Sequence, residues 1–511
     1  MTTGAPPPAP PMVGRRHALG EQFARVAALA ALLLLPSAAR ATDSVHTLRA
    51  GFAAITERHL ERTDPTDLGH WALRGLEALE PNISTSRRGP ALRIAFPGRL
   101  PIERLMGGTP SSVAEAVATL YAEAEILSPS IQRAGPQRVL QAGFEEIFNH
   151  LDPYSRYVTP GEARQARERR LGAADLGLTL GPAPGNGVAV LTVAPNSAAA
   201  QVGLRPGDRV LAADGVPLSA GALADAARLL EGPPGSGLLL QIRRGRRTQE
   251  LLLTRAAAPP LAVSSEVRDG VLWLRVPVFS AGTASQLDSA LDRAESATRG
   301  VVLDLRGNRG GLLQQAIQVA DSFLSLGTVA FTEGRHPDAR RRFVATGGDL
   351  ADGRPLVVLV DGRTASAAEV VAAAIGDHGR GVVVGSTTLG KGLIQILVPM
   401  PEGAELLVSW SRILAPLGWP LQSLGVMPTV CTSRGAEETS AALAALATGD
   451  NLLSPMLARH RAARAPVPVS EVTALRSACP PAEGRDADLA AARTLLDRPE
   501  TYRAALHRPD G

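Results

Sequence analysis

The stretch that decides the fold runs from Pro355 to Val371 and reads PLVVLVDGRTASAAEVV. Its first part, Pro355–Val360, is an unbroken apolar run, which is typical of a strand buried on both faces of a parallel sheet. From Asp361 onward the chain turns and opens a helix near Ser366. A buried strand that passes directly into a helix predicts an α/β fold with a largely parallel sheet.

Strands and helices continue to alternate on both sides of this stretch. Val271–Val276 and Val301–Leu305 read as further strands, and Ala284–Ala294 as a helix between them. We therefore expect a multidomain protein with a parallel-sheet α/β core, a β-rich domain and helical N- and C-terminal segments. The expected parts are a helical N-terminal region at 42–165, short strands broken by glycine turns at 172–257, the α/β core at 258–435 and a helical C-terminal region at 436–511.

Ser366 allows two interpretations. Together with Glu369 it forms an S-x-x-E pattern, which by itself predicts a helix cap. A serine at a helix N-terminus also lies among unpaired N–H groups and at the positive end of the helix dipole, which favours a nearby oxyanion. The flanking Ala365, Ala367 and Ala368 leave room for a substrate chain.

Lys391 is the only lysine among 53 Lys and Arg residues. Arginine cannot be deprotonated in proteins, whereas a lysine in a dry pocket can become a neutral amine. Lys391 follows Ser366 by 25 residues, after the strand-like run Gly381–Gly385. A strand–helix–strand step of this length can return the chain to the start of the first helix. Lys391 therefore either accepts a proton or occurs in this glycine-rich loop by chance.

Residues 1–41 have the pattern of a secretory signal peptide. Three arginines precede the apolar run Val26–Leu35, and Ala39-Arg40-Ala41 supplies a small-residue cleavage site. We expect cleavage after Ala41 and a periplasmic or secreted protein. The alternative is an uncleaved membrane anchor, for which this run is short.

Charge and cysteine content narrow the classes of partner and cofactor. Residues 1–41 hold four arginines and one glutamate, so the rest of the chain carries 49 basic and 48 acidic residues. Because the charges balance and form no basic stripe, we expect no nucleic acid partner, and membrane association is not required. No Cys or His residues have metal-ligand spacing, so we expect no metal and no cofactor. Cys431 and Cys479 allow a disulfide, whose geometry the spacing does not decide.

A second pattern lies at Val202–Val210, which reads VGLRPGDRV. It resembles the Gly-Leu-x-x-Gly-Asp turn of PDZ domains, and a helix expected at about Ala222–Leu230 fits the same fold. PDZ domains bind a C-terminal peptide as an added strand. The resemblance implies that backbone N–H groups of Leu176-Gly177-Leu178 hold the terminal carboxylate, although Asp175 places an acid beside it. A small β-domain without a ligand is the alternative.

The motifs of the core resemble those of the C-terminal processing peptidases, a family of Ser/Lys-dyad serine endopeptidases with an inserted PDZ domain. The resemblance covers roughly residues 140–432, in the family's order. The motifs that carry it are Leu151-Asp152-Pro153-Tyr154-Ser155, Leu303–Gly311 (LDLRGNRGG), Ala365-Ser366-Ala367-x-Glu369, Gly376–Gly381 (GDHGRG), Gly390-Lys391-Gly392-x-x-Gln395 and Gly425-Val426-Met427-Pro428.

The resemblance implies a role for each matching residue. Ser366 would be the nucleophile and Lys391 the general base. Because an ammonium group cannot accept the serine proton, burial must keep this lysine as a neutral amine. Gln395 would orient Lys391, since side chains four residues apart on a strand can share a face.

The oxyanion hole would use the N–H of Ala367 and one N–H from Gly310 or Gly311. Two positions depart from the family pattern: Arg309 stands where the family usually has Pro, and Leu389 where it usually has Phe. Leu389 is a small change at a packing position, whereas Arg309 could alter the substrate cleft beside the oxyanion loop.

Two further polar pairs are predicted to be structural. Asp304 and Arg306 are expected to anchor hydrogen bonds. Asp377 and His378 would allow a Ser-His-Asp arrangement, but they follow Ser366 at the far end of its helix and are expected to point away from it.

We therefore predict a serine endopeptidase of the C-terminal processing type that cleaves secreted or envelope proteins, with the PDZ domain recognising accessible C-termini of protein or peptide substrates. A non-catalytic PDZ scaffold that binds envelope protein tails is the alternative. A relative of acyl-CoA enzymes, which also use two oxyanion amides, is a weaker one. The helical terminal regions are candidates for contact with a second copy or an adaptor.

Overall fold

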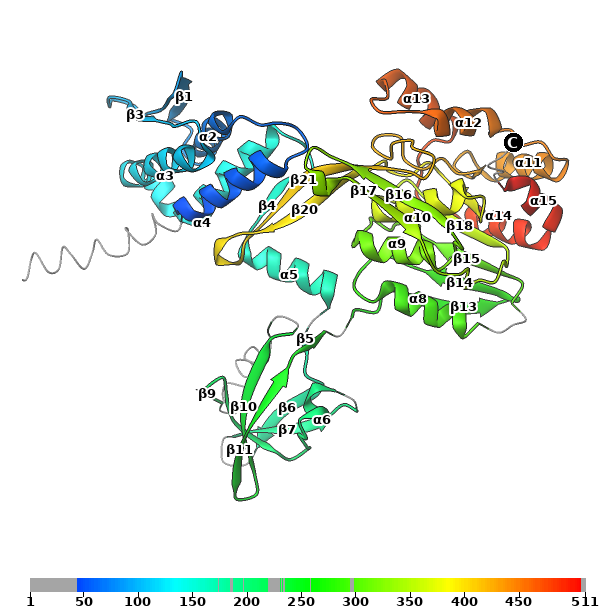
Figure 1. Ribbon diagram of the computed structural model, residues 1–511, viewed down its shortest axis with the longest axis horizontal. Helices are drawn as coiled ribbons and strands as arrows, with labels where there is room; N and C mark the ends of the chain where they lie inside the picture. The colour runs from blue at the N-terminus through cyan, green and yellow to red at the C-terminus, as the bar shows by residue number, and fades with distance from the viewer. Residues whose placement is uncertain are drawn as a thin grey trace, which may run out of the picture. The chain divides into compact units, whose positions relative to one another are not determined.

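Figure 1 shows the computed structural model of the chain. It describes residues 44–172, 174–183, 187–195, 197–218, 230, 232, 235–257, 259–294 and 298–506. The expected signal peptide at 1–41 and the expected PDZ helix, apart from Leu230, lie outside these residues. Within them, every helix is too short or too polar to cross a membrane. The chain divides into two compact units, one of residues up to Thr159 with Leu397–Val408, the other of Pro160–Ile396 with the residues after Val408.

The first unit is mainly helical. Its helices are residues 44–58, α2 (Pro65–Arg74), the 3₁₀ turn η1 (Gly75–Ala78), α3 (Pro110–Leu127) and α4 (Pro129–Asn149). Phe52, Leu73, Val117 and Phe144 are fully or almost fully buried in this unit. Its strand β4 (Arg156–Val158) pairs antiparallel with residues 405–407, the start of β21.

The first unit also contains a three-stranded antiparallel sheet that the sequence analysis missed. Its strands are β1 (Ser84–Arg88), β2 (Ala91–Ala95) and β3 (Ile102–Leu105). Gly89, with a φ of 53°, makes the turn between β1 and β2, a backbone conformation that favours glycine. Only Leu92 and Ile94 of β2 are buried, and two alternating residues are too short a pattern to separate a strand from a helix.

The second unit is built on a six-stranded sheet. Its order is β13-β14-β15-β18-β19-β22, and every pair from β14 to β22 is parallel. The strands are β13 (Ser264–Arg268), β14 (Val271–Arg275), β15 (Gly300–Asp304), β18 (Leu356–Val360), β19 (Val382–Gly385) and β22 (Val430–Cys431). Every residue of β15, β18 and β19 is buried, which explains their unbroken apolar sequences.

Helices cover both faces of this sheet (Figure 1). Leu303 and Val358 pack into one core with α8 (Thr283–Asp292), α9 (Leu313–Asp321) and α10 (Ala367–Asp377). Their neighbours Val302 and Val357 point the other way, into a second core formed with C-terminal helices. The helices of that core are α11 (Ala436–Ala447), α14 (Asp486–Asp497) and α15 (Pro499–Ala505). The C-terminal region is therefore a layer of the α/β core.

A second group of strands adjoins the core within the second unit. Strand β16 (Gly327–Glu333) pairs with β17 (Arg341–Ala345) and with residues 412–414 of β21. Apart from the β-rich region, the other elements of the part of the chain that the structure describes are α5 (Pro160–Leu171), β5 (Ala174–Asp175), β12 (Ala256–Ala257), η3 (Pro337–Ala339), β20 (Leu393–Pro399), η4 (Pro401–Gly403), β21 (Glu405–Leu414), α12 (Ser454–Ala462) and α13 (Val469–Ala478).

The β-rich region forms its own antiparallel sheet in the order β11-β10-β8-β7-β6, with β9 paired to β8. Its elements are β6 (Leu178–Ala183), β7 (Gly187–Val193), α6 (Ala198–Gln201), β8 (Arg209–Ala213), β9 (Val216–Pro217), β10 (Gly237–Arg244) and β11 (Arg247–Thr254). Asp208 is buried before β8 and accepts hydrogen bonds from the Arg205 N–H and from both ends of the Arg244 guanidinium. The bond to Arg244 holds the pKa of Asp208 below its usual range. The Gly-Asp motif thus fixes the entry into β8.

Candidate active site

Ser366 lies at a sharp, strained turn between β18 and α10. Its φ and ψ are 56° and −119°, a region that residues other than glycine rarely adopt, at a strain of roughly 1–3 kcal/mol. Such a strand-to-helix turn is the form in which α/β hydrolases expose a nucleophilic serine. Ser366 is half-buried and occupies the cap position of α10, where it forms a capping box with Glu369, the side chain of each residue accepting the backbone N–H of the other. The capping box that the S-x-x-E pattern predicts is therefore confirmed, and the role of Ser366 as a nucleophile stays a prediction.

The loop before Ser366 is held rigidly. One carboxylate oxygen of Asp361 accepts the N–H groups of Arg363, Thr364 and Gly307 at 3.0, 2.9 and 3.0 Å. The N–H of Ala365 donates to the carbonyl of Asn308 at 2.9 Å. The turn that carries Ser366 is thus bonded to the loop that follows β15.

Glu369 joins the candidate nucleophile to the candidate base. Its side chain is fully buried, and its Oε2 accepts the backbone N–H of Ser366 at 2.6 Å and that of Lys391 at 3.0 Å. Because both amides bond to one oxygen, their nitrogens lie no farther apart than the sum of these distances. The other oxygen accepts the N–H of Gly390 at 2.7 Å and the Thr388 hydroxyl. Burial raises the pKa of Glu369, and these four donors oppose that effect.

The role of Glu369 was not recognised from sequence. The S-x-x-E pattern indicated only that Glu369 bonds back to the start of α10, which it does. Nothing in the sequence showed that the same carboxylate also binds the loop of Lys391, 22 residues later.

Lys391 lies in the loop between β19 and β20 and is half-buried. Gly390 has a φ of 84°, and a Cβ there would lie 3.0 Å from the backbone of Ser423. A Cβ on Gly392 would lie 2.2 Å from the backbone nitrogen of Gln422. The glycines on either side of the lysine are therefore required for close packing of this loop.

Gln395 lies on β20, and its amide donates to the Leu393 carbonyl and the Ser409 hydroxyl, each at 3.1 Å. The strand begins at Leu393, so Lys391 precedes it. The expectation that both side chains share one strand face is therefore wrong. A role for Gln395 in orienting Lys391 stays a prediction.

The glycines after β15 pack against the Ser366 turn. A Cβ on Gly310 would lie 2.9 Å from the Cβ of Ser366. The N–H of Gly310 donates to the side-chain oxygen of Asn308 at 2.7 Å, so this amide already has an acceptor. Among the residues that the structure describes, no acceptor is found for the N–H of Gly311 or of Ala367.

The two polar pairs make structural contacts. Arg306 donates to both carboxylate oxygens of Asp304, at 2.9 and 2.8 Å. Asp377 accepts the indole N–H of Trp419 at 2.8 Å, and His378 bonds the carbonyl of Thr328 at 2.7 Å. Asp377 and His378 end a helix that begins beside Ser366, roughly 16 Å away at 1.5 Å per residue. They form no triad with it.

The predicted carboxylate loop of the β-rich domain precedes its edge strand β6. Leu176 is buried, Leu178 is half-buried, and Gly177 has a φ of 68°. A Cβ on Gly177 would lie 2.0 Å from the Cβ of Ser197, so only glycine fits. The carbonyl of Gly177 accepts the N–H of Ala194 at 2.7 Å, which fixes the loop against the end of β7.

Cys431 at the end of β22 and Cys479 after α13 form a disulfide, with 5.7 Å between their Cα atoms. It ties the C-terminal region to the edge of the core sheet. The described residues contain no group of three or more His, Cys, Asp or Glu side chains that could hold a metal ion.

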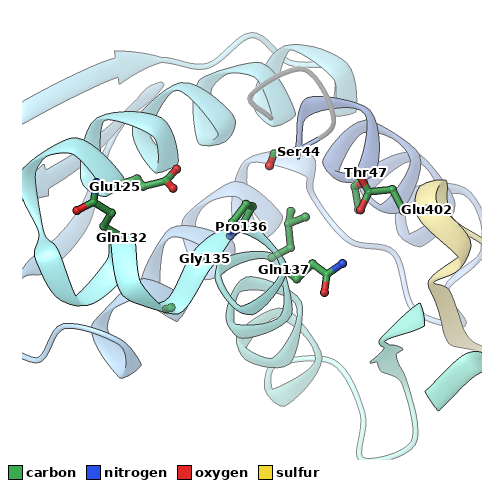
Figure 2. A pocket seen from close by; sticks show the side chains of 10 residues that line it. Ser44, Thr47, Glu125, Gln132, Gly135, Pro136, Gln137 and Glu402 are labelled. Carbon is green, nitrogen blue, oxygen red and sulfur yellow. The ribbon is translucent and has the colours of Figure 1, made fainter. Parts of the chain in front are cut away.

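Figure 2 shows a cavity of about 570 Å³ in the first unit. Glu125, Gln132 and Glu402 are among its polar lining residues, and the kink of α4 at Gly135 and Pro136 forms one side. None of the predicted site residues lines it, so it is separate from the candidate active site.

Comparisons with known proteins identify the family of the chain. The sequence profile of peptidase family S41 matches residues 270–432, and that of the PDZ domain matches residues 190–244. A carboxy-terminal-processing protease of Bartonella bacilliformis is 32% identical over 302 residues, 58% of this chain and 69% of the relative. A carboxyl-terminal-processing protease of Synechocystis is 34% identical over 296 residues, 56% of this chain and 69% of the relative.

A solved structure titled photosystem II D1 C-terminal processing protease covers 76% of this chain and 92% of its own, at 23% identity and a TM-score of 0.37. The sequence matches extend over the α/β core and the PDZ domain and include Ser366 and Lys391 within their span. The chain belongs to the carboxy-terminal processing proteases, serine peptidases of family S41 with a PDZ domain.

Proposed function

We propose that Ser366 is the nucleophile and Lys391 the general base of this peptidase. One observation carries the proposal: a single oxygen of buried Glu369 binds the backbone amides of both residues. The strained backbone of Ser366, at the N-terminus of α10, supports a hydroxyl held ready for attack.

The chemistry follows from these groups. As Ser366 Oγ attacks the substrate carbonyl carbon, its proton passes to the neutral Nζ of Lys391. The resulting ammonium gives this proton to the leaving amine nitrogen, which breaks the peptide bond and leaves an acyl-enzyme. Water then attacks the ester, its proton passes to Lys391 and returns to Ser366, and the new carboxyl terminus is released.

The oxyanion of each tetrahedral intermediate would be bound by the N–H groups of Ala367 and Gly311. Ala367 is the first residue of α10, where backbone N–H groups point out of the helix. Gly311 is favoured over Gly310 because the Gly310 N–H is already bonded to Asn308. The loop Leu176-Gly177-Leu178 and the edge strand β6 would bind the substrate's C-terminal segment by strand addition.

The chain's substrates are proteins, and we propose that it meets them in the periplasm or outside the cell. The expected signal peptide supports this location. The Cys431–Cys479 disulfide supports it too, because disulfides persist in oxidising compartments.

The test is fluorophosphonate labelling and peptide cleavage with purified full-length protein. Wild type should be labelled at Ser366 and should cleave a peptide substrate, while Ser366→Ala should do neither. Lys391→Arg should lose at least about 100-fold in labelling rate because the guanidinium stays charged, with the unfolding temperature nearly unchanged. Normal labelling in Lys391→Arg would refute the dyad. A wild-type protein that neither reacts with the probe nor cleaves a peptide would favour the alternative function, a non-catalytic PDZ scaffold.

A further inference from the structure

Residues 476–488, from the last turn of α13 to the first turn of α14, form a segment that we call the C-terminal strap. It is anchored covalently at Cys479, which is bonded to Cys431 of β22. Pro480 and Pro481 follow, and their fixed φ angles limit the conformations that the segment can adopt. The strap is thus a short, tethered piece of chain rather than a loose connection.

The strap binds the loop that carries Lys391. Nη1 of Arg476 donates to the carbonyls of Thr388 and Leu424 at 2.9 and 2.8 Å. The Ser386 hydroxyl donates to the carbonyl of Ala482 at 2.9 Å and accepts the Ala482 N–H at 3.0 Å. The strap therefore fixes this loop at two positions before the lysine.

The strap also binds the turn before Ser366. The N–H of Gly362 donates to the same Ala482 carbonyl at 2.7 Å, and the N–H of Gly484 donates to the Asp361 carboxylate at 3.1 Å. The other oxygen of that carboxylate holds the amides of the Ser366 turn. One carbonyl, that of Ala482, thus bonds both the serine turn and the lysine loop.

The third contact is with the loop that carries the oxyanion glycines. Nη1 of Arg306 donates to the carbonyl of Arg485 and to Asp488, each at 3.1 Å. A Cβ on Gly484 would lie 2.9 Å from the Arg306 side chain, so the strap passes close against this arginine.

From these contacts we propose that the C-terminal strap positions the catalytic loops, and that Arg476 is a positioning residue for Lys391. The inference rests on the proposed Ser366–Lys391 dyad. Arg476 suits this role because its charge is permanent and its guanidinium can serve several carbonyls at once. Thr388, whose carbonyl it holds, also donates its hydroxyl to Glu369, so displacement of Thr388 would move the junction between base and nucleophile.

The experiment compares Arg476→Gln, Arg476→Lys and Arg434→Gln in the full-length protein. Arg434 is the matched control, since it donates to the Ser477 carbonyl on the strap but has no described contact with the catalytic loops. The readouts are the rate constant of fluorophosphonate labelling, kcat and KM for one peptide, and the unfolding temperature.

Arg476→Gln should lower the labelling rate and kcat by about 10- to 100-fold, because a small displacement of a catalytic group strongly lowers the reaction rate. KM should change by less than about twofold, since the strap touches catalytic loops and not the peptide-binding strand. Arg476→Lys should recover at least about fivefold of the loss, because an ammonium can still donate to these carbonyls. Arg434→Gln should stay within about twofold of wild type.

The strap inference is overturned if folded Arg476→Gln labels within twofold of wild type, or if Arg434→Gln loses as much activity. If Arg476→Gln fails to fold, Ser386→Ala tests the strap inference instead, with an expected loss of about three- to tenfold in labelling rate. A Ser386→Ala protein that labels at the wild-type rate would then overturn the inference. Ser366→Ala separates the two proposals. If Ser366→Ala still cleaves the peptide, the dyad is refuted. If Ser366→Ala is inactive but Arg476→Gln has wild-type activity, only the strap inference is refuted.

Discussion

Replacing Glu369 by Gln should damage both the active site and the stability of the core. The carboxylate accepts four donors, two at each oxygen. Glutamine keeps one oxygen, and its NH₂ group must face two of these donors. It should turn this group toward Thr388 and Gly390, because the hydroxyl can rotate to accept while an amide cannot.

The expected loss follows from these bonds. One buried N–H, that of Gly390, is left unpaired, at about 1–3 kcal/mol. The two bonds from Ser366 and Lys391 lose the assistance of a negative charge, about 1 kcal/mol each. Part of this is offset because burial raises the pKa of Glu369 and a neutral amide is easier to bury. The free energy of unfolding should therefore fall by about 2–4 kcal/mol.

If displacement of the Lys391 loop raises the activation free energy by half of that loss, kcat falls about tenfold, since 1.36 kcal/mol corresponds to a factor of ten. Asp377→Asn is the matched control, as Asp377 is a buried carboxylate at the other end of the same helix. It should lose stability because Arg461 loses its buried charged partner, yet label at the wild-type rate. Urea unfolding and fluorophosphonate labelling measure the two effects. Equal loss of labelling in both variants would refute the reasoning.

Three further outcomes are expected. Burial lowers the pKa of His460 to about 4, so the stability that the neutral imidazole contributes is complete above its usual pKa of 6.5 and is lost as pH falls toward 4. The free energy of unfolding of His460→Gln, measured with urea, should therefore depend less on pH between these two values than that of wild type. An unchanged pH dependence would contradict this. Gly310→Ala should lower kcat at least about tenfold, since its Cβ would meet Ser366, and normal turnover would contradict the close approach. Gly177→Ala should weaken binding of a C-terminal peptide, measured by calorimetry, while fluorophosphonate labelling persists, because its Cβ would meet Ser197.

The turn that carries Ser366 and its sheet were predictable because their signals are local. Pro355–Val360 is apolar throughout since both sheet faces are covered, and Ser366 follows where the strand ends. The choice between a cap and a nucleophile was not local. The capping box is present, and the proposal of a nucleophile depends on the backbone angle of Ser366 and on the bonds of Glu369 to the Lys391 loop, neither of which residue types encode directly.

The parts that sequence reasoning missed depend on contacts between distant segments. Glu369 was assigned to a helix cap because its partners three residues away are visible in sequence, whereas Gly390 and Lys391 are not. The C-terminal region read as a separate helical segment because Ala492 and Leu495 lie on an ordinary amphipathic helix. Only the structure shows that they pack against Val302 and Val357 of the central strands.

This packing leaves the core incomplete without the C-terminal helices. A chain that stops near Thr432 has all the strands of the core sheet, but one side of that sheet, including Val302, Val357 and Leu359, faces water. The core sheet is therefore covered on both faces only when α11, α14 and α15 are present. A chain truncated near Thr432 should therefore expose this apolar face and lose stability.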